Sequence, residues 1–281
     1  MSVKTIFVGP CFGSQLDSTG PSASLVDYAV SLAASQGAHL SVGLGIFDVV
    51  VHSAILASLE EVVDSYNQEL RGKAKRFADA LTPRLRASGV VAEIEFVQGA
   101  FSSVARRVVQ MARVTDVAIL EPNNEAFSLQ EGLVEEVLFG SGRPVIAVPN
   151  KWAGRAAPQR IMVAWDGGAK AARAIGDALP FLSLAQEVEV VSVSGDVNPA
   201  KRLDGAEIAP HLARHCRSVK VIQLASIDGD IAATLGGHAR LIGADLLVMG
   251  AYGHAKVIEV ILGGVTRSMI FEPPIPVFMS C

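Results

Sequence analysis

The chain has 281 residues, of which half are hydrophobic and 19% are charged, and its formal net charge is −4. This length predicts about two domains. The acidic balance argues against a nucleic-acid binder, and no apolar run approaches the ~20 residues that a membrane span needs. Three widely separated cysteines form neither a disulfide framework nor a zinc site. We therefore expect a reduced, cytoplasmic protein that binds neither nucleic acid nor membrane.

Strands alternate with helical patterns through the first half of the chain. The predicted strands are Thr5–Gly9, His39–Ile46, Val90–Val97, Asp116–Leu120 and Gly142–Val148, and the predicted helices are Pro21–Gln36, a long one from Ile55 that bends or ends near Pro83, Phe101–Arg113 and Leu129–Phe139. Because helices separate the strands, we expect parallel pairing through right-handed crossovers, which gives a doubly wound sheet.

The second half repeats this order with a shorter segment between its second and third strands. The predicted strands are Arg160–Trp165, Val188–Val193, Val219–Leu224, Asp245–Met249 and Val277–Met279, and the predicted helices are Ala169–Leu182, Ala206–Cys216, Ile231–Ile242 and Val265–Phe271. The opening strands Thr5–Val8 and Arg160–Val163 match each other, as do Asp116–Glu121 and Asp245–Gly250. The chain therefore reads as two tandem copies, residues 1–150 and 151–281, joined by a linker near 150–158.

A group of glycines follows the fourth strand of the second copy. Gly250 and Gly253 lie three residues apart, and Gly263 and Gly264 follow nine residues later, just before a helix. Glycines between a parallel strand and a helix let the backbone approach a ligand closely and point several N–H groups at one anion. Since ligands of open parallel sheets bind beyond the carboxyl ends of the strands, this pattern predicts a phosphate site there.

The spacing Gly250-x2-Gly253-x9-Gly263 resembles the nucleotide-binding signature of the universal stress protein family, in which a Ser or Thr follows the third glycine. The resemblance covers both halves of the chain. It implies an α/β protein with two flavodoxin-like, Rossmann-like (HUP-type) domains, each a five-stranded parallel sheet with helices on both faces. It also implies that the second copy binds ATP, ADP or AMP, and it leaves open whether magnesium accompanies the ligand.

The resemblance assigns contacts to the ends of the strands and to the glycine loop. Asp166 would accept hydrogen bonds from the ribose or the adenine edge, Ala164 and Val193 would meet the base, and His254 would touch a phosphate. The full expected set is Ala164, Asp166, Val193, Met249, Gly250, Gly253, His254, Gly263, Gly264, Val265 and Thr266. The alternatives are that Asp166 caps the next helix, that the glycines serve turn geometry and helix packing, and that His254 is a solvated loop residue.

The second copy departs from the family pattern at one position. Gly264 stands where the family has a hydroxyl residue, and the nearest hydroxyl in the sequence is Thr266. A lost hydrogen bond to a charged group costs about 1.5–3 kcal/mol. We therefore expect weaker triphosphate binding or a shift in preference toward AMP or ADP.

The first copy lacks the same features. Glu121 stands in the place of Gly250, Cys11 in that of Asp166, and Glu131-Gly132 in that of Gly263-Gly264. Because a carboxylate would repel phosphate, we expect no nucleotide in this copy. Cys11 could be a reactive thiol at a helix start, and His211 and His215 could hold a metal ion, but no partner groups support either interpretation.

By resemblance the protein has a regulatory role in the stress response and acts on a protein partner whose identity stays open. The closing strands Val145–Val148 and Val277–Met279 would be unpaired sheet edges, so we expect them to pair in an intramolecular pseudo-dimer. Whether the chain forms a homo-oligomer stays open as well. No general base is placed for phosphoryl transfer, so any ATPase activity should be weak. The alternatives are a slow ATP hydrolase or autophosphorylating enzyme, and a scaffold without nucleotide.

Overall fold

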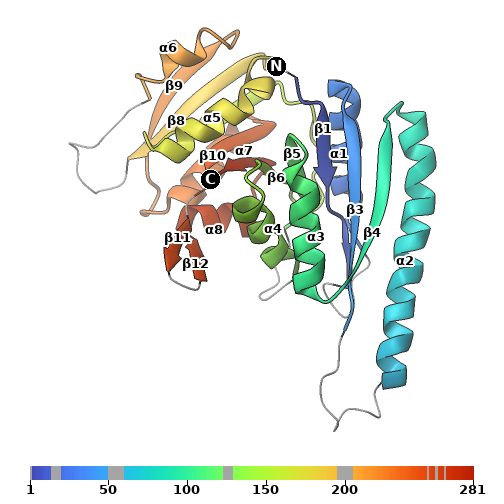
Figure 1. Ribbon diagram of the computed structural model, residues 1–281. Helices are drawn as coiled ribbons and strands as arrows, with labels where there is room; N and C mark the ends of the chain where they lie inside the picture. Colours follow the sequence, from blue (N-terminus) through green and yellow to red (C-terminus); the bar gives the residue numbers. More distant parts are fainter. Residues whose placement is uncertain are drawn as a thin grey trace.

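The computed structural model describes residues 2–13, 20–49, 60–122, 129–194, 205–251, 253–256, 259–262 and 264–281. It is an α/β protein in which the strands of both halves form one long, largely parallel sheet with helices on both faces (Figure 1). The fold class expected from the sequence is confirmed. Among the described residues, no helix is both long enough and apolar enough to cross a bilayer.

The first half is a five-stranded parallel sheet in the order β4-β3-β1-β5-β6, with the two-residue strand β2 added beside β3. Its strands are β1 (Thr5–Val8), β2 (Cys11–Phe12), β3 (His39–Phe47), β4 (Ala92–Gly99), β5 (Val117–Leu120) and β6 (Val145–Ala147). Its helices are α1 (Ala23–Gln36), α2 (Glu60–Ala87), α3 (Phe101–Arg113) and α4 (Leu129–Gly140). The long helix α2 ends at Ala87, one turn after Pro83.

The second half has the same topology, with the parallel order β9-β8-β7-β10-β13. Its strands are β7 (Arg160–Ala164), β8 (Glu187–Ser194), β9 (Val219–Ala225), β10 (Leu246–Gly250), β11 (Gly253–Lys256), β12 (Glu259–Leu262) and β13 (Val277–Ser280). Its helices are α5 (Ala169–Leu182), α6 (Ala209–Leu212), α7 (Ile231–Leu241) and α8 (Gly264–Phe271).

Two features of the second half differ from the sequence prediction. The helix expected at Ala206–Cys216 shrinks to α6, because His215 and the residue before it donate their N–H groups to carbonyls only three residues back, which tightens the chain out of the α-helix. In addition, β11 and β12 pair as an antiparallel hairpin that extends from the end of the sheet (Figure 1), where we expected a loop.

The two halves join where β6 pairs antiparallel with β13, with Ile146 opposite Phe278. This pairing makes one sheet of 11 strands among the described residues. One apolar core lies between the sheet and helices α1, α2, α5 and α6, and the other lies under α3, α4, α7 and α8. Each of these two cores contains residues of both halves. Neither half therefore has a core of its own, and both cores continue across the join.

Truncating Phe278 tests the join. Its side chain is fully buried, and its ring centroid lies 5.8 Å from that of Phe181 on α5. We expect Phe278→Ala to lower the free energy of unfolding by about 3–5 kcal/mol, because it removes a large side chain from a closed core. Chemical denaturation measures this, with the exposed Val114→Ala as a control that should change stability by less than about 0.5 kcal/mol. A loss below about 1 kcal/mol for Phe278→Ala would contradict the described packing.

Candidate functional site

The candidate site lies where the strand order of the second half reverses. β7 has β8 on one side and β10 on the other, and Val163 of β7 is in register with Val248 of β10. Asp166 follows β7 and Gly250 ends β10, so the fold brings both to the same edge of the sheet. This is the switch point at which open α/β sheets bind ligands.

Asp166 forms a tight local turn at the start of α5. The residue is exposed, and its Oδ1 accepts a hydrogen bond of 2.8 Å from the N–H of Gly168, the N-cap residue. Gly167 between them has a φ of 75°, which favours glycine. Because Gly168 is itself the N-cap and makes no side-chain capping bond, Asp166 closes a turn just before α5 rather than capping its first turn.

Helix α5 packs so closely on the end of β10 that only glycine fits at position 250. A Cβ atom at this position would lie 2.6 Å from the backbone nitrogen of Ala171 and 2.6 Å from the carbonyl carbon of Lys170. Those atoms belong to the first turn of α5, which cannot withdraw without moving the helix. The packing explanation therefore accounts for glycine at this position by itself.

Gly264 is in a different environment, although it belongs to the same motif. It is exposed and begins α8, and within the described part of the chain no atom beyond its neighbours and its own helix backbone lies within 4 Å of where its Cβ would be. The open space lies beside the first N–H groups of a helix, which attract anions through their unpaired donors and the helix dipole. Val265 is half-buried and Thr266 is buried behind it.

The remaining expected residues divide between the strand ends and the hairpin. Ala164 and Val193 are half-buried at the ends of β7 and β8, and Met249 is buried near the end of β10. Gly253 and His254 belong to β11, where the structure describes the backbone only. Gly263 lies outside the described residues.

A contact that we did not predict fixes the chain beside Asp166. The buried Trp165 donates its indole N–H to Oε1 of Glu207 over 2.6 Å. This bond ties the turn that begins at Gly205 to the end of β7. The two residues are 42 positions apart, so no local sequence pattern predicts their bond. The tryptophan at the end of a strand was the only sign of it in the sequence.

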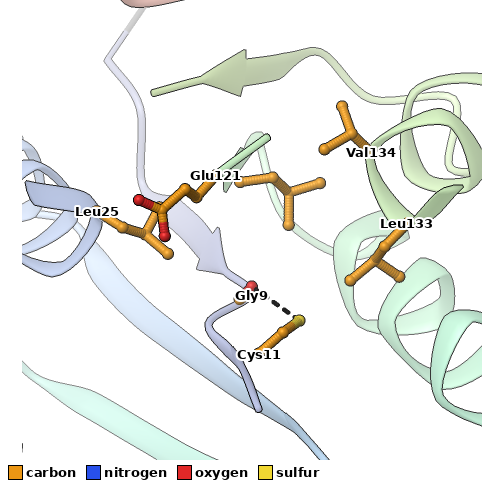
Figure 2. Close-up of a pocket in the computed structure, with 7 residues that line it drawn as sticks. Gly9, Cys11, Leu25, Glu121, Leu133 and Val134 are labelled. Carbon is orange, nitrogen blue, oxygen red and sulfur yellow. Dashed lines mark hydrogen bonds between the residues drawn. The ribbon is translucent and has the colours of Figure 1, made fainter. Parts of the chain in front are cut away.

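The corresponding edge of the first half is filled. Figure 2 shows Glu121, the counterpart of Gly250, beside Leu25 of α1, with Cys11 below and α4 opposite. The space they enclose is about 10 Å³, room for about one water molecule. At the start of α4, a Cβ on Gly132 would lie 3.0 Å from the ring of Phe101, whereas a Cβ on its counterpart Gly264 would meet none of the described side chains within 4 Å.

Neither of the two weaker candidates from the sequence gains support. Cys11 lies in β2, where burial and then the charge of Glu121 raise the pKa of its thiol to about 12, so it is not an activated nucleophile. His211 and His215 have ring centroids 5.0 Å apart. Within the described part of the chain, no group of three or more potential metal ligands forms around them or elsewhere.

Alanine substitution at two glycines separates close packing from ordinary helix propensity. We expect Gly250→Ala to lower the free energy of unfolding by about 1–3 kcal/mol, because its Cβ meets backbone. The matched control is Gly176→Ala in the middle of α5, where nothing lies within 4 Å, and it should raise stability by about 0.5–1 kcal/mol. Both values come from denaturation midpoints, and equal effects would contradict the contact between β10 and α5.

Comparisons with known proteins agree with this arrangement. Residues 158–280 match the model of the universal stress protein family. The structure of a universal stress protein from Archaeoglobus fulgidus aligns with 98% of this chain and 97% of its own, with 18% identity and a TM-score of 0.67. A Pseudomonas aeruginosa protein assigned to the same family aligns with 99% of this chain and 93% of its own, with 14% identity and a TM-score of 0.58. The comparison with curated proteins gives no match.

At these identities the aligned structures show a shared fold over the whole chain, and the family model identifies the second half. Residues 158–280 therefore form a domain of the universal stress protein family.

Proposed function

We propose that the protein binds an adenine nucleotide at the carboxyl edge of its second half and acts as a regulatory protein of the stress response. The observation that carries the proposal is the start of α8 at Gly264, which lies within a family-matched domain and offers main-chain donors that no described side chain obstructs. Asp166 and the ends of β7 and β8 line the same edge of the sheet.

The residues present fit the chemistry of the ligand. The phosphates would lie against the main-chain N–H groups at the start of α8, because this helix has no acidic residue in its first turn to repel them. Asp166 would accept a hydrogen bond from the ribose, and Ala164 and Val193 would contact the base. Gly253, His254 and Gly263 complete the motif as sequence-based expectations.

The role that we propose is binding rather than turnover. Asp166 would face the ribose and the base, so it would lie at the wrong end of the nucleotide to act on a terminal phosphate. A nucleotide hydrolase on the same sheet is the rival function. Incubation with ATP and magnesium separates the two, since many fast turnovers would exclude a binding protein and favour the enzyme.

We also infer that the join between β6 and β13 replaces a dimer of separate chains, and that the nucleotide changes the affinity for a protein partner. The join covers two short apolar strands that would otherwise be exposed edges. An adenine nucleotide bound in one half only would then leave the other half free for a different task.

Calorimetry with ATP, ADP and AMP tests the binding site. We expect saturable binding by the wild-type chain and none by Gly253→Glu, because a carboxylate in the loop would repel phosphate. The control is Gly176→Glu, which adds the same charge on the exposed middle of α5 and should bind like wild type. If the wild type binds no adenine nucleotide, or if Gly253→Glu binds as well as wild type, the proposed site is wrong.

Restoring the family hydroxyl tests the role of Gly264. We expect Gly264→Ser to tighten ATP binding by about 10- to 100-fold, since a hydrogen bond to a charged group contributes about 1.5–3 kcal/mol. Gly264→Ala is the matched control, because it adds the same Cβ in open space without the hydroxyl. Equal dissociation constants for the two variants would show that the position after Gly263 does not contact the phosphates.

A further inference from the structure

Glu121 is a carboxylate held at the start of a helix with one of its two oxygens unpaired among the described residues. It directly follows β5, and its Oε2 accepts a hydrogen bond of 3.0 Å from the N–H of Ser22, the N-cap residue of α1. Its other oxygen, Oε1, is buried and has no hydrogen-bond partner among the described residues. An orphaned carboxylate oxygen is unusual, because buried polar atoms nearly always have partners.

The surroundings of Glu121 offer no positive charge. The cavity beside it is lined by the Cys11 thiol, the Gly9 carbonyl and the apolar side chains of Leu25 and Leu133, among others (Figure 2). The raised pKa of Cys11 keeps this thiol neutral. Among the described residues, no lysine or arginine forms an ion pair with Glu121.

The other titratable side chains that the structure describes on the neighbouring elements do not line the cavity. Asp27 of α1 is exposed and pairs with Arg84 of α2. On α4, Glu136 is exposed and Glu135 is half-buried with a partner of its own. Asp116 lies at the opposite end of β5, where it accepts hydrogen bonds from the N–H groups of Lys4 and Thr5. Cys11 is therefore the titratable neighbour that faces Glu121 within the described residues.

Two effects act on the charge of Glu121. Hydrogen bonding from the side chain and then the N–H of Ser22, together with the dipole of α1, favours the ionised form. Burial opposes it, because an ionised carboxylate with one oxygen unpaired loses hydration that nothing replaces. Burial is the larger effect and raises the pKa of Glu121 above its ordinary value. A protonated carboxyl could keep accepting from Ser22 while its O–H points toward the carbonyl of Gly9 or a water in the cavity.

We propose that Glu121 is a proton-binding site built into the first half, and that proton binding at Oε1 makes this half more stable as the pH falls. The sign follows from linkage. The folded protein holds the proton more tightly than the unfolded chain, so the added stability is fully present below the unfolded pKa. It is lost as the pH rises through the folded pKa. The Asp116 carboxylate behaves in the opposite way, because hydrogen bonds lower its pKa.

The proposal is tested by denaturant unfolding of the full chain between pH 4 and pH 8. Between the unfolded and folded pKa of Glu121, the folding equilibrium constant of wild type should fall by up to about tenfold per pH unit because of this group. Glu121→Gln removes the titration but keeps an acceptor for Ser22, so its stability relative to wild type should rise with pH. Glu136→Gln on the exposed face of α4 is the matched control and should follow wild type. A Glu121→Gln variant with the pH dependence of wild type would overturn the proposal.

A direct titration keeps the test decisive if the variant does not fold. Carbon-13 NMR of glutamate-labelled protein follows each side-chain carboxyl with pH. Glu121 is assigned as the resonance that is protected from dissolved relaxation agents and that persists in a Glu189→Gln variant, which removes the signal of the other buried glutamate. A midpoint above the ordinary value of about 4.3 supports the proposal. A midpoint at or below that value overturns it.

Discussion

The antiparallel pairing of β6 with β13 is the interaction on which the rest of the structure depends. Each half is parallel within itself, so joining two closing strands head to tail points the two sets of carboxyl ends in opposite directions. The candidate site after β10 and its counterpart after β5 therefore lie at opposite edges of one sheet. Without the pairing, both strands would be short apolar edges, and neither core would be continuous through the chain.

One position distinguishes the two edges, namely the residue at the end of the fourth strand beside the start of the first helix. In the second half this residue is Gly250, and the backbone of α5 lies directly against it. In the first half it is Glu121, whose side chain bridges the gap to Ser22 of α1. In both halves a carboxylate accepts a hydrogen bond from the N–H of a helix N-cap residue. This carboxylate is Asp166 in the second half and Glu121 in the first. The same topology thus leaves one edge open and fills the other.

Periodicity was sufficient to predict the regular elements, and tertiary contact decided the rest. The bounds of α3 and α5 follow from the sequence, because each helix has a continuous apolar face and begins after a residue in extended conformation. The two-residue strand β2 and the hairpin of β11 and β12 are too short or too polar to carry such a pattern. The repulsive carboxylate of Glu121 was readable from the sequence. Its bond to Ser22 was not, because 99 residues separate the two.

The glycine motif shows why residue type alone does not fix a role. Gly250 is needed by a helix that packs on it, whereas no described side chain packs against Gly264 at the start of α8. Its counterpart Gly132 lies against Phe101, so the same residue type is covered in one half and bare in the other. An anion would gain most where a helix start has neither a side chain in front of it nor an acidic residue in its first turn, and α8 meets both conditions as far as the described side chains show. The asymmetry between the halves therefore lies at the end of the fourth strand and the start of the last helix: Glu121 and Gly132 are covered in the first half, where Gly250 and Gly264 stand in the second.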